Sequence, residues 1–479
     1  MLFNSLDFIL FFIAVVFLHY TLPHKFRWVM LLIASCIFYM CWRAELIILI
    51  LFSTFANWGI SLLIDKYRDK AKGLLIFSII INFGLLFIFK YAMFINHTFM
   101  GVYEYFGWNY PINEFNIILP MGISFYTFQA ASYTIDIYRN DYKPEKNYFK
   151  FTLFVTFFPQ LVAGPIERAD RLLGQLFTKK KFNVNNLSEG VKLMIMGYFK
   201  KIVIADRAAV LVDTIFNNCR EYSGLSYIIA TIFFTFQIYG DFSGYSDIAR
   251  GCARILGIDL MYNFDRPYFS KSIKEFWRRW HISLSSWLRD YIYIPLGGSR
   301  CSKIRKYFNL MVTFLASGLW HGANWTYVMW GGLHGLYQVI GDIKNTVLPK
   351  WDNFAINFFR IIITFILVAF AWILFRANTI SDSIYIMKNL FNDVGKITDI
   401  QYIYEIFNNM GLQMFEIILV IGAIAVLIFS EIISFKMDIH RLMDRLPFVL
   451  RFAYYYLLVI IIFGMGVFSG GGQFIYFQF

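Results

Sequence analysis

Apolar segments long enough to cross a lipid bilayer recur along the whole chain and limit what it can fold into. A spanning helix needs about 17–25 mostly apolar residues, because lipid offers no partners to backbone N–H and C=O groups. Segments of about this length lie at 4–21, 28–42, 45–63, 74–95, 119–138, 190–212, 223–245, 354–375, 412–434 and 452–470. No hydrophilic stretch is long enough for a soluble domain. We therefore expect one all-α polytopic membrane domain over residues 1–479, with about ten transmembrane helices.

The composition supports a membrane protein and argues against a nucleic-acid-binding one. The chain is 58% hydrophobic and 16% charged, whereas soluble domains average about 45–50% and about 25%. The net charge is +13, but the Lys and Arg residues form short clusters between apolar segments rather than a basic tail. Five cysteines without a CxxC pair, and histidines without HExxH spacing, favour neither a disulfide framework nor a metal site.

The distribution of basic residues predicts the topology. Basic clusters follow the first, third and fifth spans, while the loop 97–118 contains no Lys or Arg. Cytoplasmic loops are enriched in Lys and Arg, so the N-terminus is expected outside. Lys436, Arg441, Arg445 and Arg451 would then be inside, and ten crossings would leave both termini extracytoplasmic. The first Lys is Lys25, so residues 6–20 are expected to be a retained span rather than a cleaved signal.

Two apolar segments do not fit the alternation. Residues 151–163 are short, and residues 307–343 are interrupted by glycines, with basic loops on both sides of each. Irregular backbone at membrane depth is tolerated only where protein buries it or it lines a cavity. Both segments are therefore predicted to be re-entrant hairpins near a cavity.

A strongly basic segment at 264–306 holds ten Lys or Arg and three acidic residues. Apolar residues recur within it at steps of three and four, which predicts an amphipathic helix at the cytoplasmic interface. His281 would lie one turn after Trp277, at the margin of the apolar stripe. The segment taken alone also fits a membrane-surface helix whose arginines meet lipid phosphates.

A second histidine, His321, stands between Trp320 and Gly322 inside the glycine-interrupted hairpin. Ionisable residues at membrane depth are functional candidates by default, and burial favours the neutral imidazole that a general base needs. A structural histidine bonded between helices is the alternative. For His334, in the same hairpin, the structural interpretation is the stronger one.

Asp241 and Asp247 lie in the run QIYGDFSGYSD at 237–247. They are expected near the inner end of a span. The sequence leaves open whether they orient a histidine, pair with Arg250 or Arg254, or only mark the interface.

Four motifs together resemble the membrane-bound O-acyltransferase (MBOAT) family, specifically its alginate O-acetylase-like branch. They are FPQLVAGPIER (158–168), QIYGDFSGYSD (237–247), EFWRRWHISLSSWLRDYIYIPLGGSR (275–300) and WHGANWTYVMWGGLHG (320–335). The motif-bearing core covers about 120–340. Beyond about residue 345 only hydropathy agrees with the family.

The resemblance implies tilted transmembrane, re-entrant and interfacial helices around a central tunnel. It implies that His321 is the essential buried histidine and His281 its partner. It further implies acetyl-CoA as a cytoplasmic acyl donor, with no permanently bound cofactor, in the bacterial cytoplasmic membrane. The acceptor would be an exported polysaccharide, or an SGNH-type partner acetyltransferase that completes the transfer.

The residues suggest how such a site would work. Arg278, Arg279, Arg289 and Arg300 are candidates for the phosphates of CoA. His281, Asn324 or backbone N–H groups are candidate oxyanion donors, and Trp277 and Trp320 flank the two histidines. We expect His281 to be less buried than His321, and therefore easier to protonate.

Three alternatives remain at this stage. Within the family, the rival is D-alanyl transfer to teichoic acid, although the first motif and the chain length fit the alginate-like branch better. Outside it, the hairpins suit a transporter, for which no internal symmetry is visible, or a non-catalytic scaffold of a glycan-export complex. The sequence does not name the polymer or the acyl group beyond a preference for acetyl.

Overall fold

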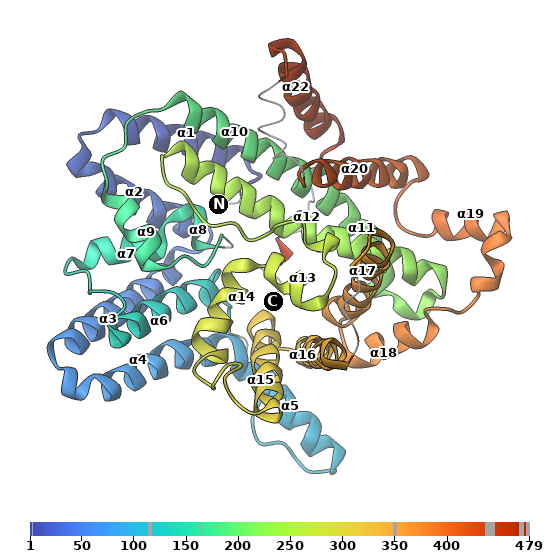
Figure 1. Ribbon diagram of the computed structural model, residues 1–479, viewed down its shortest axis with the longest axis horizontal. Coiled ribbons are helices and arrows are strands. Elements are labelled where there is room, and N and C mark those ends of the chain that lie inside the picture. The colour runs from blue at the N-terminus through green and yellow to red at the C-terminus, as the bar shows by residue number, and fades with distance from the viewer. Residues whose placement is uncertain are drawn as a thin grey trace. The chain divides into compact units, whose positions relative to one another are not determined.

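The computed structural model describes residues 1, 3–113, 117–162, 164–347, 352–435, 446–468 and 474–475. The described part of the chain is helical, without a β-strand (Figure 1). It divides into two compact units, one of Met1–Val191 with Ala249–Met261 and one of Lys192–Ile248 with Tyr262–Phe479. Lys436, Arg441 and Arg445, predicted to be cytoplasmic, lie outside the described residues.

The first unit is a helical bundle formed mainly by the N-terminal third of the chain. Its helices are α1 (Leu6–Thr21), α2 (His24–Met40), α3 (Ile47–Lys66), α4 (Ala71–Leu86), α5 (Ala92–Tyr105), α6 (Ile123–Arg139), α7 (Tyr148–Thr156), α8 (Phe158–Leu161) and α9 (Ala169–Phe177). Helices α3, α4 and α6 pack on one another. Between α3 and α4, Asn57 and Asn82 are fully buried and exchange amide hydrogen bonds of 3.0 and 2.7 Å. Polar residues within these apolar helices therefore face the protein interior.

The second unit contains the motif-bearing segments. Helix α10 (Val184–Tyr198) leads into the unit and continues through a π-helical segment, Phe199–Ala205, into α11 (Asp206–Asn217). The remaining helices are α12 (Leu225–Ile255, which ends in the first unit), α13 (Ile273–Arg279), α14 (Ile282–Leu288), α15 (Lys303–His321), α16 (Trp325–Val347), α17 (Phe354–Arg376), α18 (Ile380–Asn389), α19 (Ile400–Asn408), α20 (Met414–Ile433) and α22 (Phe448–Met465). Aromatic side chains fill its core, among them Trp280, Trp330 and Trp372.

Six described helices are long and apolar enough to cross a membrane. They are Ala44–Lys66, Arg68–Tyr105, Leu225–Ile255, Phe354–Arg376, Met414–Ile433 and Phe448–Met465. They correspond to six of the ten predicted spans. Of the other four predictions, three coincide with helices of only 16 or 17 residues, α1, α2 and α6, and one with the interrupted α10–α11 segment. The count of ten stays a prediction.

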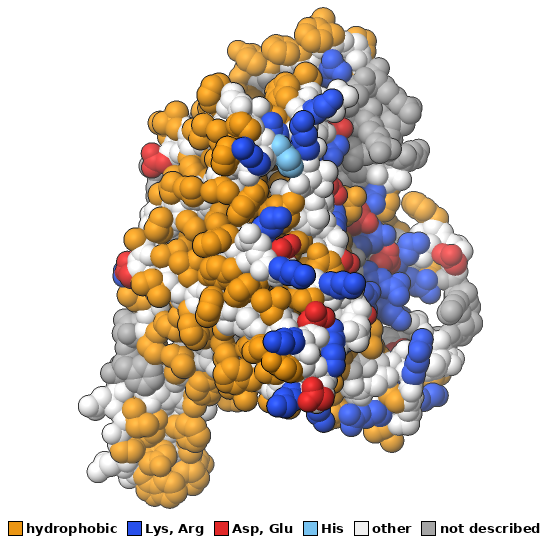
Figure 2. All heavy atoms as spheres, turned by 90° about the vertical axis from the view of Figure 1, so that its left-hand side faces the viewer, with side chains coloured by type: hydrophobic (Ala, Val, Ile, Leu, Met, Phe, Trp, Pro, Cys, Tyr) orange, Lys and Arg blue, Asp and Glu red, His pale blue; other side chains and the backbone are white. Residues whose placement is uncertain are grey.

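The surface of these helices has the character that lipid contact requires. Large apolar side chains are exposed along α3 and α4, for example Phe52, Phe55, Phe77 and Ile80. In the space-filling view, hydrophobic side chains form a broad continuous area, and Lys and Arg gather along one side of it (Figure 2). A soluble monomer rarely exposes apolar patches above a few hundred Å². The protein is therefore a membrane protein.

The segment predicted as a re-entrant hairpin, 307–343, is the helix pair α15 and α16, which turns at Gly322–Asn324; its re-entrant course in the membrane stays a prediction. Glycine is required where these helices meet. A Cβ atom on Gly331 would lie 2.3 Å from the Phe314 carbonyl oxygen, and one on Gly318 would lie 2.3 Å from the Tyr327 carbonyl oxygen. Small residues let helix backbones approach closely in membranes. The first predicted hairpin, 151–163, is a buried break between α7 and α8.

The prediction of one amphipathic interfacial helix around His281 is wrong. The segment breaks into α13 and α14, because Trp280 is extended and His281 takes a left-handed conformation with φ +42°. The break directs the apolar side chains of both short helices into the protein, so Phe276, Trp280 and Leu284 are fully buried, while Lys274 and Arg278 stay exposed. The apolar periodicity therefore serves the protein core instead of the lipid surface.

Candidate active site

His321 is the last residue of α15 and is 2% exposed. Its imidazole is enclosed by aromatic rings, with ring-centroid distances of 5.0 Å to Trp330, 5.1 Å to Trp320 and 5.4 Å to Phe375. These rings come from α15, α16 and α17. The turn after His321 depends on Gly322, where a Cβ atom would lie 2.2 Å from the Tyr327 ring. The hairpin thus holds the histidine in an apolar, close-packed environment.

His281 lies beside His321 in the same unit, as the resemblance implied. The two imidazole centroids are 6.3 Å apart, and the rings are inclined by 64°. Trp320 contacts both, with its centroid 5.7 Å from that of His281. Phe242 of α12 packs edge-on against His281 at 4.5 Å. Residues 40 positions apart in the chain thus converge on one small region.

The expectation that His281 is less buried than His321 is wrong. Its side chain is 0% exposed, because the break between α13 and α14 directs it inward. Burial lowers the pKa of His281 to about 3. The imidazole is therefore neutral at physiological pH and keeps one N–H that can donate a hydrogen bond.

His334 occupies a structural position, as the sequence favoured. It is fully buried, and its Nδ1 accepts a hydrogen bond of 3.2 Å from the indole Nε1 of Trp277. This bond fixes the orientation of Trp277, which lies one turn before His281 on α13. Trp277 thus acts as a support for the site.

A large cavity is lined by residues of α13 to α17, the stretch of chain that also contains the two histidines. It has a volume of about 990 Å³ and an apolar interior that includes Trp277, Phe314 and Ser317, the last one turn before His321. Its basic lining residues are Lys271, Lys274, Arg278, Arg289, Lys306, Lys344 and Arg360. Of the four predicted CoA-binding arginines, Arg278 and Arg289 line this cavity. Arg279 is instead paired with Glu275 at 2.7 Å, and Arg300 is not among the lining residues described.

A second cavity, of about 580 Å³, begins just beyond His321. Ala323, Asn324 and Tyr327 of the hairpin line it. Its other polar lining residues are Lys201, Asp206, Asp213, Asn217, Gln237, Asp241, Arg376 and Asn378. Neither histidine is among the described lining residues. Along the chain, His321 stands between Ser317, which lines the basic cavity, and Ala323, which lines the carboxylate- and amide-rich one.

The family model for MBOAT, the membrane-bound O-acyltransferase family, matches residues 144–387, which include both histidines and both cavities' central residues. The chain belongs to this family.

Curated relatives of this O-acyltransferase agree on the class of reaction. It is 40% identical over 385 residues to the "Probable alginate O-acetylase AlgI" of Pseudomonas aeruginosa, covering 79% of this chain and 73% of the relative. It is 34% identical to the peptidoglycan O-acetyltransferase of Helicobacter pylori, over 81% and 80%. The teichoic acid D-alanyltransferase of Streptococcus thermophilus is more distant, at 29% over 49% and 64%.

The aspartates of the O-acyltransferase have partners that sequence reasoning missed. Asp241 pairs with Lys201 at 2.6 Å, and its second oxygen accepts a hydrogen bond from the Ile475 N–H at 2.7 Å. Lys201 also pairs with Asp206 at 2.7 Å. Asp247 pairs with Lys200 at 2.8 Å. The signal was present in the Lys200–Lys201 pair inside a predicted span, where a charge needs a buried partner.

Asn324, a candidate oxyanion donor, has its side chain engaged locally. Its Nδ2 donates to the Asn378 carbonyl at 3.2 Å, and its Oδ1 accepts from the Thr326 N–H at 3.0 Å. The bond from Thr326 closes the turn of the hairpin, and the bond to Asn378 ties the turn to the residues after α17. A better-placed donor is Trp330, whose indole Nε1 is buried without a hydrogen-bond partner among the described residues and whose ring packs against His321.

Proposed function

We propose that this O-acyltransferase moves an acetyl group from acetyl-CoA to a hydroxyl of an exported polysaccharide or of peptidoglycan, directly or through an SGNH-type partner protein. The observation that carries the proposal is the pairing of His281 with His321, whose ring centroids are 6.3 Å apart. Residues close to His321 in the chain line a basic cavity on one side of it and a polar cavity on the other. A transfer across a membrane needs one site that the donor and the acceptor reach from opposite sides.

The basic cavity suits the acyl donor. CoA carries several phosphate charges, and Lys and Arg bind phosphate through charge-assisted hydrogen bonds. Seven basic residues line the cavity against two acidic ones, Asp342 and Asp352. Lys306 is paired with Asp342 at 2.6 Å and Arg289 with Asp290 at 2.7 Å, so Arg278 is the strongest candidate for phosphate contact. The apolar wall around Phe314 would receive the pantetheine arm, which leads toward His321.

The chemistry requires a base and an oxyanion donor. His321 accepts the proton of the acceptor hydroxyl as the oxygen attacks the thioester carbonyl of acetyl-CoA. The N–H of neutral His281, with that of Trp330 as a second donor, stabilises the tetrahedral oxyanion. The intermediate collapses by breaking the C–S bond, and imidazolium His321 returns the proton to the departing CoA thiolate. The products are the acetyl ester and CoA–SH.

The polar cavity suits the acceptor. Sugars are bound through dense hydrogen bonding, and this cavity offers carboxylates and amides from several helices. Its ion pairs, such as Arg376 with Asp213 at 2.5 Å, hold these side chains in place. A serine hydroxyl of an SGNH-type partner would use the same route as a sugar hydroxyl. The acceptor would come from outside the cell and the donor from the cytoplasm.

That orientation is testable. We propose that the enzyme resides in the bacterial cytoplasmic membrane with residues 264–306 on the cytoplasmic side and both termini outside. In a variant without native cysteines, Ser302→Cys in intact cells should react only with a membrane-permeant thiol reagent. Reaction with an impermeant reagent would reverse the orientation and separate the basic cavity from cytoplasmic CoA.

The alternative within the family, D-alanyl transfer, has less support. The named D-alanyltransferases are 29% and 26% identical to this chain, against 38–40% for the alginate O-acetylases. The deciding experiment incubates the purified protein with radiolabelled acetyl-CoA or, separately, with a D-alanyl-loaded carrier protein. CoA release and labelled ester from the first substrate alone support acetyl transfer. Transfer from the carrier alone would replace the proposal with D-alanylation.

A further inference from the structure

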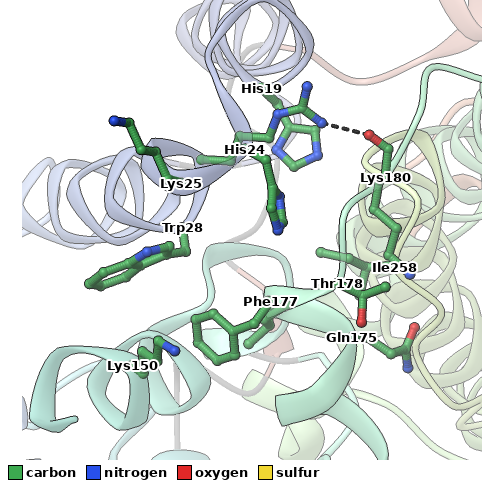
Figure 3. Close-up of a pocket in the computed structure, with 12 residues that line it drawn as sticks. His19, His24, Lys25, Trp28, Lys150, Gln175, Phe177, Thr178, Lys180 and Ile258 are labelled. Carbon is green, nitrogen blue, oxygen red and sulfur yellow. Dashed lines mark hydrogen bonds between the residues drawn. The ribbon is translucent and has the colours of Figure 1, made fainter.

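The first unit contains a small pocket that plays no part in the proposed acetyl transfer. It has a volume of about 190 Å³ and lies where α1 ends, α2 begins and α9 closes the far side. In Figure 3, the His24 ring projects from the start of α2 into the space, with Trp28 on one side and Phe177 and Thr178 opposite. Pockets for drug-sized ligands have about 300–1,000 Å³, so this one suits a single charged group.

The pocket carries strong positive charge. Lys25, Arg27, Lys150 and Lys180 line it, and none of its twelve described lining residues is acidic. Arg27 donates hydrogen bonds to backbone carbonyls, at 2.6 Å to Lys180 O and 3.0 Å to Leu22 O. Carbonyl oxygens fix the guanidinium without neutralising it. The described lining therefore holds four basic residues and no carboxylate, although the Lys25 ammonium points away from the space.

Two imidazoles add hydrogen-bonding capacity that the protein leaves unused. His19 is 4% exposed; its ring lies near the Leu256 backbone, but neither ring nitrogen makes a hydrogen bond of good geometry to a described residue. Nδ1 of His24 makes no such hydrogen bond either. Buried polar atoms without partners are uncommon in folded proteins and call for an explanation. An anionic oxygen in the pocket would accept hydrogen bonds from both rings.

The start of α2 strengthens the preference for an anion. Its N-cap is Pro23, which provides no side-chain hydrogen bond. The first turn of a 17-residue helix thus presents uncapped N–H groups and the positive end of the helix dipole. No acidic residue occupies this first turn.

We propose that this pocket binds a phosphate group, supplied by the headgroup of an anionic phospholipid such as phosphatidylglycerol. Basic pockets between transmembrane helices are suited to such headgroups. The apolar surface of Trp28 and Phe177, whose ring centroids are 6.2 Å apart, would contact the glycerol and the first methylenes. Inorganic phosphate offers the same chemistry without this apolar part.

The test titrates the purified full-length protein with dioctanoyl phosphatidylglycerol, with dioctanoyl phosphatidylcholine and with inorganic phosphate, and measures bound ligand by native mass spectrometry. The variant Lys150→Gln/Lys180→Gln removes two pocket charges. The control Lys70→Gln/Lys72→Gln removes two exposed charges from the first unit at positions that do not line the pocket. His24→Gln removes the imidazole and leaves the charges of the four basic lining residues unchanged.

Phosphatidylglycerol should bind more tightly than phosphatidylcholine. The pocket variant should weaken its binding by about tenfold or more, and His24→Gln by severalfold, while the control changes it less than twofold. Equal losses in the pocket and control variants would overturn the proposal in favour of general surface charge. Inorganic phosphate binding as tightly as the lipid would overturn the lipid assignment. If the pocket variant is folded, judged by its melting temperature, and binds phosphatidylglycerol like the wild type, the site is wrong. If the pocket variant misfolds, wild-type binding by His24→Gln overturns the site instead.

Discussion

The ammonium group of Lys201 lies 2.6 Å from one carboxylate oxygen of Asp241 and 2.7 Å from one of Asp206. All three side chains are at least 92% buried. The lysine therefore compensates two carboxylates beside the polar cavity. Because one cation joins residues of α11, α12 and the π-helical segment between α10 and α11, this cluster fixes three segments beside the polar cavity.

Lys201→Met should strongly destabilise the protein. The variant leaves two buried carboxylates without their cation, and breaking a buried ion pair costs about 3–5 kcal/mol. The melting temperature in detergent should fall by several degrees. Lys200→Met is the matched control, because Lys200 pairs with Asp247 at a more exposed position and its loss should cost much less. Equal melting temperatures for the two variants would contradict the role assigned to Lys201.

Gly331→Ala should destabilise the hairpin, whereas Gly341→Ala on the same helix should not. A Cβ atom at position 331 would meet the Phe314 carbonyl oxygen at 2.3 Å, but one at position 341 meets nothing within 4 Å. Overpacking costs about 1–3 kcal/mol, while an unhindered helical Gly→Ala change is neutral to stabilising. Thermal unfolding of both variants measures the difference. Similar stabilities would show that the helices are less closely packed than described.

Arg278→Gln and Arg279→Gln should differ although the residues are neighbours. Arg278 lines the basic cavity, and Arg279 is paired with Glu275. Loss of one charge-assisted hydrogen bond costs about 1.5–3 kcal/mol, so Arg278→Gln should raise the KM for acetyl-CoA about 10- to 100-fold with little change in kcat. Arg279→Gln should leave this KM within about twofold. A larger rise in KM for Arg279→Gln than for Arg278→Gln would show that the CoA phosphates do not bind at Arg278.

Glu167→Gln should alter how stability depends on pH. Glu167 is fully buried, its carboxylate accepts a hydrogen bond from the Met261 N–H at 2.6 Å, and burial raises its pKa from 4.5 to about 7. The folded protein thus binds a proton more tightly than the unfolded chain. Its contribution to stability is complete below pH 4.5 and is lost as the pH rises through 7. Between pH 4.5 and 7 the free energy of unfolding of the wild type should fall by up to roughly 3 kcal/mol, whereas that of Glu167→Gln should not show this fall. Parallel unfolding curves across pH 4.5–7 would contradict the raised pKa.

The sequence predicted the broad architecture because hydropathy has a direct physical meaning in lipid. The spans of α3, α12 and α17 and the hairpin at His321 follow from apolar length and from glycines at a close helix contact. The resemblance also named His281 and His321 as partners, and their rings lie close together; their catalytic role stays a prediction. The break at His281 escaped prediction, because a left-handed residue leaves no trace in apolar periodicity.

The sequence also could not predict which charged side chains pair with one another. Arg278 and Arg279 are chemically identical. Only the direction of each side chain decides that Arg278 lines the cavity and Arg279 pairs with Glu275. Lys201 and Asp241 lie 40 positions apart on different helices, so their pairing depends on tertiary packing. The lipid-facing or core-facing role of the tryptophans near His281 likewise depends on packing that periodicity does not encode.

The central claim is that His281 and His321 act as one catalytic unit, with His321 as the base and His281 as an oxyanion donor. Its most direct test is the rate of acetyl transfer from acetyl-CoA by purified His281→Ala, His321→Ala and the double variant, each with a verified melting temperature. His321→Ala should have no detectable activity, and His281→Ala should lose about 10²–10³ in rate. The double variant should be scarcely worse than His321→Ala, because residues acting as a unit are not additive. Full activity of His281→Ala, or near wild-type activity of His321→Ala, would contradict the paired-histidine site.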